Sequence, residues 1–364
     1  MKLIAYASLK TLPHMYEGDI RILDAVNLFS IQVLPDGTAA FMDDDHDFSC
    51  IARSRAINPS IKFLLMLGGC SHCSDAFLRK SGRERFAETL MELLKAYDLD
   101  GLDNDWEVPT MTLSSVRGRP VDKYTYTMMM REIRRRMDEE EARTGRHYLL
   151  TCAQSAQRFV IDTVEVEKLV PLVDYINVMT YDLRGTYAAF ELHDDLALPS
   201  GHHTCTYPTA GDTEALCAQY AVELFRAWGV PDEKIVIGSG IYAKHYDNCG
   251  PENNGLLNRT NTREFYLQLP GGDGISQFTT SNQSRLLPYL KENGYVRYWD
   301  DDAKASWWYS ESKRDFVSLD DEESLWHKVQ YIKKEGLLGL MFWRYEMDDL
   351  HTLIAAAGKA AHEN

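Results

Sequence analysis

Three acids stand on alternate residues in the stretch DGLDNDWE, residues 100–107: Asp103, Asp105 and Glu107. Alternate residues of a β-strand face the same side, so the three carboxyl groups would line up along one face. The flanking residues Leu102 and Trp106 are apolar, which argues against a solvated acidic edge. Neighbouring carboxylates in apolar surroundings cannot all ionise cheaply, so at least one pKa rises and protons are shared. This pattern suits general acid–base chemistry, with Glu107 as the acid and Asp105 exchanging the shared proton.

A metal site is the alternative interpretation of the same acids. Carboxylates that step down one strand lie at increasing depth, so their oxygens do not converge on one point. We therefore expect no metal there, and nothing in the sequence implies a cofactor.

The cysteines raise a second possibility of a metal site. CSHC at 70–73 could combine with HHTC at 202–205 to bind zinc. The chain has seven cysteines, an odd number scattered along its length, which fits free thiols in a reducing compartment. We expect Cys70 and Cys73 to be ordinary thiols.

The elements that would position the acids alternate regularly along the chain. Eight short apolar segments predict strands: 2–8, 25–33, 62–69, 99–107, 148–156, 175–182, 234–242 and 337–345. Amphipathic or charged stretches predict helices between them, among them 81–97, 122–144, 212–228 and 320–335. This alternation predicts an α/β protein whose parallel strands close into a (β/α)8 TIM barrel. Glu107 would then lie at the carboxyl end of the fourth strand, where barrel enzymes place their active sites.

One connection is too long to be a simple loop. About 65 residues follow the seventh strand, and they are rich in Asn, Gly, Tyr and Trp. We predict a single catalytic barrel domain over residues 1–364, with a small inserted α+β subdomain at 245–309. A shorter insertion, at about 184–211, would follow the sixth strand.

Charge and hydropathy limit the partners and the location. The net charge of −16 argues against nucleic acid and anionic membrane surfaces as partners. No apolar run is long enough to cross a membrane. The N-terminal MKLIAYASLK resembles a first strand more than a secretion leader, so we expect a cytoplasmic protein unless a leader has been removed.

The sequence resembles glycoside hydrolase family 18, the chitinases and their relatives. DGLDNDWE matches the pattern DGxDxDxE of that family, and the resemblance extends over nearly the whole chain. Further matching segments are LLMLGG at 64–69, VMTYD at 178–182, YWDDDAKASWWYS at 298–310 and the stretch 319–343.

The resemblance implies a mechanism in which the substrate's own 2-acetamido oxygen is the nucleophile and the configuration is retained. Glu107 would protonate the glycosidic oxygen. Asp105 would bond the acetamido N–H, Tyr181 would bond the acetamido oxygen, and Asp103 would tune Asp105.

The resemblance also implies a set of residues that bind the sugar. Asp182 would contact sugar hydroxyls or a neighbouring acetamido group, and Trp343 would form the hydrophobic floor. The same pocket would be lined by Tyr6, Phe29, Met179 and Tyr242.

Three functions fit this resemblance. The first is a chitinase acting on oligosaccharides that contain N-acetylglucosamine; the second is an endo-β-N-acetylglucosaminidase acting on the chitobiose core of N-glycans. The third is an inactive lectin, in which the terminal Glu is typically replaced. Cys70, Val108 and Lys244 depart from residues common in the family, which leaves the subsites and the preferred glycan open. The oligomeric state is not indicated.

Overall fold

The computed structural model describes residues 1–43, 46–68, 70–112, 117–184, 199–213, 216–258, 264–266 and 282–363. Its larger sheet has the strand order β1-β14-β8-β7-β6-β5-β4-β2-β3, with a further pairing of β1 with β2. That order is a closed eight-stranded barrel with the short β3 added antiparallel to β2. The strands are β1 Lys2–Ser8, β2 Ala25–Val33, β3 Ala39–Phe41, β4 Lys62–Leu67, β5 Gly101–Asn104, β6 Leu149–Ser155, β7 Tyr175–Met179, β8 Ile235–Gly240 and β14 Gly339–Trp343.

The predicted (β/α)8 barrel is therefore confirmed, and each of the eight predicted strands overlaps one barrel strand. The largest difference is at β5, which ends at Asn104 although a strand was predicted as far as Glu107. Among the helices, the predicted 122–144 agrees with α5, whereas α9, Ala218–Ala227, is shorter than predicted. Half of the predicted insertion at 184–211, residues 185–198, lies outside the described residues.

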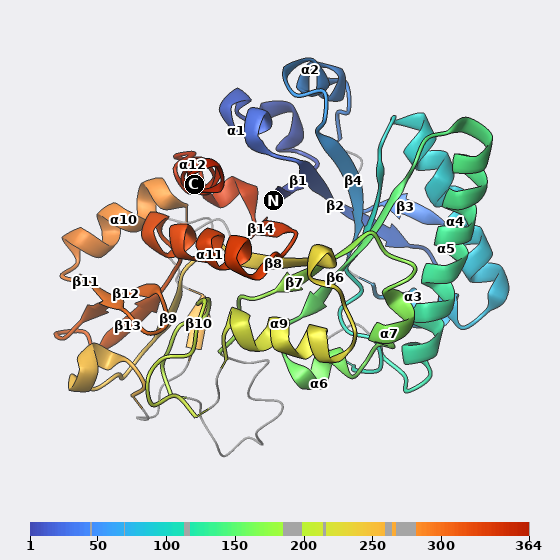
Figure 1. The fold of residues 1–364 in the computed structure, drawn as a ribbon. Coiled ribbons are helices and arrows are strands. Elements are labelled where there is room, and N and C mark those ends of the chain that lie inside the picture. Colours follow the sequence, from blue (N-terminus) through green and yellow to red (C-terminus); the bar gives the residue numbers. More distant parts are fainter. Residues whose placement is uncertain are drawn as a thin grey trace. The chain divides into compact units, whose positions relative to one another are not determined.

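The chain divides into two compact units. The first consists of Lys2–Val178 and Phe225–Val236. Helices α4 and α5 lie side by side in it (Figure 1), and the α4 residues Phe86, Leu90 and Leu94 are fully buried. Its helices are η1 Leu12–His14, α1 Glu17–Ile22, α2 Cys50–Ile57, α3 Cys73–Phe77, α4 Lys80–Ala96, α5 Asp122–Thr144, α6 Arg158–Ile161, α7 Val166–Leu169 and η2 Asp232–Lys234.

A glycine begins the strand that carries the acids. A Cβ atom at Gly101 would lie 1.9 Å from the Leu149 carbonyl oxygen of the neighbouring strand β6. Any side chain there would force β5 and β6 apart, so the glycine of DGLDNDWE is required by strand packing.

The second unit consists of Met179–Leu224 and Ile237–Asn364 together with Met1, and α9 contributes to both units. It contains a five-stranded antiparallel sheet in the order β10-β9-β13-β12-β11. These strands are β9 Lys244–Tyr246, β10 Glu264–Tyr266, β11 Val296–Asp300, β12 Ala305–Ser310 and β13 Asp315–Ser318. Its helices are η3 Glu252–Gly255, α10 Gln283–Glu292, α11 Glu322–Glu335, η4 Tyr345–Met347 and α12 Leu353–His362.

Helix α10 covers one face of this small sheet (Figure 1). Its Leu286 and Leu290 are fully buried in a cluster with Trp308 and Val317 of β12 and β13. The inserted subdomain at 245–309 remains a prediction, and the strands of the sheet run from Lys244 to Ser318.

Helix α11 carries a buried ion pair. Its N-terminus is closed by a capping box between Asp321 and Ser324. One turn further on, Lys328 pairs with Asp320, and both side chains are wholly buried. Asp320 also accepts a hydrogen bond of 2.6 Å from Ser239 of β8, so the pair fastens the helix to a barrel strand.

Across the described part of the chain, no helix combines the length and the apolar character that crossing a membrane would require.

Candidate active site

The three acids lie at graded depth at the end of β5. Asp103 is fully buried on the strand, Asp105 is 8% exposed just beyond it, and Glu107 is exposed. The backbone N–H of Asp105 still donates a 2.9 Å hydrogen bond to the carbonyl of Leu67 at the end of β4. The segment is thus held to the neighbouring strand after the regular strand has ended.

Asp103 is fixed by three hydrogen bonds. It accepts from the Tyr6 hydroxyl at 2.6 Å, from the Asn177 amide at 2.9 Å and from the Thr151 hydroxyl. Burial raises the pKa of Asp103, and the hydrogen bonds from Thr151, Tyr6 and Asn177 oppose that rise without cancelling it.

The carboxyl group of Asp105 is more strongly perturbed than that of Asp103. Burial raises the pKa of Asp105 well above its ordinary value, and the charges of Glu107 and Asp103 raise it further. Its Oδ1 is buried and has no hydrogen-bond partner among the described residues. Asp105 therefore holds a proton readily and offers an unused oxygen to a ligand.

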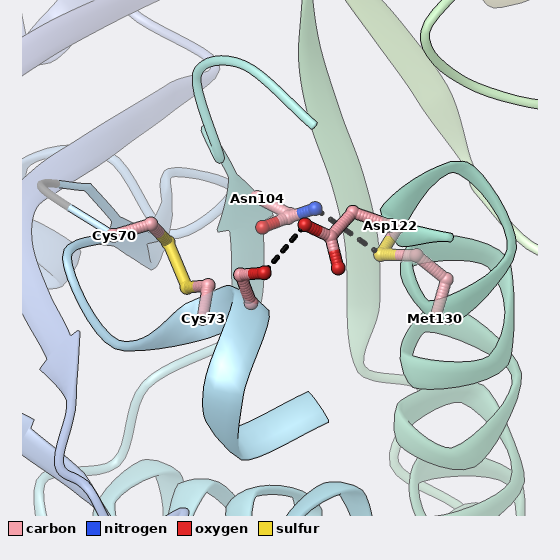
Figure 2. Close-up of a disulfide and its surroundings, with 6 residues drawn as sticks. Cys70, Cys73, Asn104, Asp122 and Met130 are labelled. Atoms are coloured by element: carbon pink, nitrogen blue, oxygen red, sulfur yellow. Dashed lines mark hydrogen bonds between the residues drawn. A yellow bond between two sulfur atoms is a disulfide. The ribbon is translucent and has the colours of Figure 1, made fainter. Parts of the chain in front are cut away.

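The residues between the acids face the opposite side. The Trp106 ring packs on Phe77 of α3 and Tyr126 of α5, with ring centres 5.7 and 5.8 Å apart. The Asn104 amide lies 3.6 Å from the sulfur of Met130 on α5 (Figure 2). The alternation thus directs the acids to one side of β5 and the packing residues to the other.

The expectation of ordinary thiols at CSHC is wrong. Cys70 and Cys73 form a disulfide between the end of β4 and the start of α3 (Figure 2). Their Cα atoms are 5.1 Å apart, within the range that a disulfide spans. The next residue, Ser74, donates a 2.6 Å hydrogen bond to Asp122 at the start of α5.

The remaining cysteines in the structure, Cys50, Cys152, Cys205, Cys217 and Cys249, are free thiols. Within the described ranges, no three His, Cys, Asp or Glu side chains are grouped as metal ligands.

A second polar group surrounds Asp182 in the other unit. The Tyr242 hydroxyl donates a 2.6 Å hydrogen bond to Asp182, and the Lys244 ammonium lies 2.8 Å from the same oxygen. His203 lies behind them, with Nε2 3.1 Å from the Tyr242 carbonyl and Nδ1 3.9 Å from Asp182. Asp182 itself adopts a φ of 52°, a left-handed conformation that Asp tolerates better than most residues.

The pKa shifts show which residues around Asp182 are charged and which are neutral. Burial works to raise the pKa of Asp182, but the charge of Lys244, together with the hydrogen bonds from Lys244 and Tyr242, outweighs it, and the net pKa is lowered. Burial lowers the pKa of His203 to about 3. At neutral pH the group is therefore an Asp182–Lys244 ion pair supported by a neutral imidazole.

Tyr181 lies beside this group. Its ring meets the Tyr242 ring edge to face, with centres 6.3 Å apart, and its hydroxyl lies 3.9 Å from the sulfur of Met341. A Cβ atom at Gly238 would lie 2.7 Å from the Tyr181 ring, so the glycine of β8 makes room for the tyrosine.

The predicted residues therefore fall into separate groups. Tyr6, Asp103, Asp105 and Glu107 belong to one unit, and Tyr181, Asp182 and Tyr242 belong to the other. The remaining predicted residues are half-buried on β2, β7 and β14: Phe29, Met179 and Trp343.

Sequence reasoning missed Thr151 and Asn177, which hold Asp103, and His203, which supports Tyr242. The first two could have been found as polar residues at inward positions of otherwise apolar strands. His203 belongs to HHTC at 202–205, which was considered only as a source of zinc ligands, and its contact with Tyr242 was not predicted.

Comparisons with known proteins agree on one family. Residues 3–348 match the family described as Glycosyl hydrolases family 18. Chitinase A1 of Niallia circulans is 33% identical over 305 residues, which cover 81% of this chain and 42% of that protein. Endochitinase of Manduca sexta is 29% identical and is covered over 54% of its length, so the chain spans about half the length of these relatives.

Solved structures show the same likeness. A family 18 N-acetylglucosaminidase from Paenibacillus barengoltzii has a TM-score of 0.84 and 30% identity, and 99% of each chain is covered. ChiW, a cell-surface chitinase of a Paenibacillus strain, has a TM-score of 0.85 and 26% identity, covering all of this chain and 33% of that one.

Proposed function

The chain belongs to glycosyl hydrolases family 18, and from this premise we propose that it cleaves β-1,4-linked N-acetylglucosamine with retention of configuration. The observation that carries the proposal is the pairing of buried Asp105 with exposed Glu107. An exposed acid can reach the leaving group, and a buried neighbour of raised pKa can share its proton, which suits general acid catalysis.

In the proposed mechanism, Glu107 protonates the glycosidic oxygen as the bond to the leaving sugar breaks. The substrate's own acetamido oxygen closes on the anomeric carbon, and Asp105 accepts a hydrogen bond from the acetamido N–H through its unused Oδ1. Glu107 then takes a proton from the water that opens this intermediate, which restores the acid. Two displacements at one carbon give net retention.

Asp103 and the Asp182 group have supporting roles in this proposal. The charge of Asp103 helps to keep Asp105 protonated in the resting enzyme. Tyr181 bonds the acetamido oxygen, and Asp182, held ionised by Lys244, receives sugar hydroxyls. Trp343, Met179, Phe29, Tyr6 and Tyr242 complete the proposed sugar-binding set.

A second candidate is an N-acetylglucosaminidase that releases single sugars. It is favoured by the Paenibacillus barengoltzii enzyme of that name, which the chain matches over 99% of both lengths at 30% identity. The endo-β-N-acetylglucosaminidase and the inactive lectin remain further alternatives. The presence of Glu107, Asp105 and Tyr181 speaks against the lectin.

Product analysis separates these functions. The protein is incubated in parallel with chito-oligosaccharides and with a high-mannose glycoprotein, and Glu107→Gln serves as the matched control. Chitobiose and longer products support the chitinase, whereas N-acetylglucosamine alone supports the second candidate. Release of a glycan that ends in one N-acetylglucosamine identifies the endo-acting enzyme, and binding without cleavage identifies the lectin.

A further inference from the structure

A cavity of about 690 Å³ opens on the small sheet of the second unit. None of the predicted site residues lines it. Its walls are formed by Pro251, Asn254, Gly294, Val296, Tyr298, Tyr309, Glu311 and Ser312.

The cavity lies at the edge of the segment around η3, which covers one face of the sheet. On the face opposite α10, the segment around η3 packs over a cluster of Tyr246, Cys249, Leu256, Trp307, Tyr309 and Phe316. That cover is fastened by a 3.1 Å hydrogen bond from the Trp307 indole to the Asn254 carbonyl. β11 is the edge strand beyond it, and its Val296 is 54% exposed. The outermost part of this face therefore has side chains available to a ligand.

A column of aromatic rings runs across the same face toward the cavity. The rings of Phe316 and Trp307 are inclined by 23° with centres 6.3 Å apart, and those of Trp307 and Tyr298 by 24° with centres 5.4 Å apart. Phe316 and Trp307 are buried, whereas Tyr298 is half-buried and lines the cavity. The column thus ends in a ring that can stack against one more flat surface.

The polar groups at the cavity indicate the chemistry of that surface. Glu311 and Ser312 are exposed at its rim, and Asn254 is half-buried there. A carboxylate, a hydroxyl and an amide together bind hydroxyl groups well, and the Glu311 charge disfavours an anion. A volume of this size suits a small-molecule ligand.

We propose that this cavity is a second carbohydrate site, in which one pyranose ring of a chito-oligosaccharide stacks on Tyr298 while Glu311, Ser312 and Asn254 bind its hydroxyls. The choice of sugar rests on the proposed function. The site would retain a long substrate and leave the cleavage of short ones unchanged.

Methyl NMR on the full chain tests this directly, because three valines report on different places. Val296 lines the cavity, Val108 follows Glu107, and Val121, the residue before α5, serves as a control that does not line the cavity. In valine-labelled Glu107→Gln protein, titration with chitotetraose should shift the Val296 and Val108 methyl signals and leave Val121 in place. Adding Tyr298→Ala should weaken the Val296 response at least tenfold and preserve that of Val108.

Two further variants test whether the loss of the Val296 response comes from the cavity or from a disturbed fold. Tyr124→Ala removes an exposed tyrosine on α5 that does not line the cavity, and it should leave the Val296 response intact. If Tyr298→Ala disturbs the spectrum broadly, Ser312→Trp fills the cavity from its rim and should abolish the response instead.

The outcomes are distinct. A silent Val296 beside a responding Val108 overturns the second site, and so does a Val296 response that survives both cavity variants. If chitotetraose moves neither signal, the proposed function fails, and cellotetraose then decides the cavity separately. A Val296 shift with cellotetraose retains a sugar site there, and silence overturns it.

Discussion

The hydroxyl of Tyr6 donates a 2.6 Å hydrogen bond to the carboxylate of Asp103, which lies 97 residues further along the chain. Both side chains are buried, one on β1 and the other on β5. The bond therefore fixes the direction of the Asp103 carboxylate. When Asp103 is ionised, its charge is therefore held in one place, and it raises the pKa of Asp105. Asp103 is in this sense a positioned charge, and Tyr6 is one of the residues that position it.

Glu107→Gln should leave the fold intact and remove hydrolysis. Glu107 is exposed, so an amide of the same shape costs little stability. Loss of the general acid should lower kcat by a factor of about 10² to 10⁴, with ligand binding retained. Steady-state kinetics on a chito-oligosaccharide, together with calorimetric binding, measure both effects. Substantial activity in this variant would show that Glu107 is not the acid.

Asp105→Asn should stabilise the protein while inactivating it. Because the pKa of Asp105 is raised on folding, the folded state binds more protons than the unfolded state between the two pKa values. The contribution of Asp105 to the free energy of unfolding therefore falls as the pH rises from about 4 through the folded pKa. Asparagine does not ionise, so the variant does not lose this stability at high pH. We expect the Tm of the variant to exceed that of the wild type by about 2 °C or more at pH 8 and to approach it at pH 4.

Asp103→Asn is the matched control for this effect. The asparagine cannot satisfy all three donors of Tyr6, Thr151 and Asn177, so this variant should lose stability at both pH values. Thermal melts of the two variants at pH 4 and pH 8 distinguish the effect of the buried Asp105 charge, which depends on pH, from the loss of the Asp103 hydrogen bonds, which does not. An Asp105→Asn variant with a lower Tm at pH 8 would contradict the raised pKa.

Lys244→Met should destabilise the group around Asp182 in a pH-dependent way. The lowered pKa of Asp182 contributes stability above its unfolded pKa, and that contribution is lost as the pH falls through the folded value. Removing the cation leaves a largely buried carboxylate with the Tyr242 hydroxyl and a neutral His203. We expect a loss of about 1–3 kcal/mol at pH 7 that narrows toward about pH 3, as the pH approaches the lowered pKa of Asp182. Denaturant titrations at both pH values measure it.

Lys244→Arg keeps the charge and is the control for that experiment. It should recover most of the stability at pH 7, although a planar guanidinium fits a single-oxygen contact less well than an ammonium. A deficit in Lys244→Met that is equally large at pH 3 would assign the loss to packing and not to the ion pair.

Reduction of the Cys70–Cys73 disulfide should lower stability modestly. The loop that it closes is short, so the chain-entropy effect is about 2 kcal/mol. The double variant Cys70→Ser with Cys73→Ser should melt at the temperature of the reduced wild type, and dithiothreitol should not change its Tm. A wild-type Tm that is insensitive to dithiothreitol, with both sulfurs shown to be reduced by alkylation and mass spectrometry, would contradict a stabilising disulfide.

The barrel could be predicted because its strands are apolar runs bounded by polar loops. β1 and β2 match their predicted residues, since nothing in those segments competes with a strand. The end of β5 was placed too late because the alternation of Asp103, Asp105 and Glu107 continues past Asn104. The alternation records which side the residues face, whereas a strand also needs a partner along its length.

Contacts between distant residues could not be predicted in the same way. The spacing of Cys70 and Cys73 permits a thiol pair, a metal site or a disulfide, and only the three-dimensional structure, in which the two sulfurs are bonded, decides among them. His203 meets Tyr242 through a ring nitrogen and a backbone carbonyl, and neither leaves a mark in the sequence. The acids themselves were recognisable because burying like charges in an apolar strand destabilises the fold, so their presence there indicates a function.

The burial of the Lys328–Asp320 pair also protects the amine of Lys328 from chemical reagents in solution. Its ammonium group is wholly enclosed, whereas Lys80 and Lys359 of the same protein are more than three-quarters exposed. An acylating reagent can therefore reach Lys328 only when the structure around α11 opens. Peptide mass spectrometry can compare the labelling rate of Lys328 with the rates of the exposed lysines. The slower rate at Lys328 would measure how often the structure around α11 opens locally.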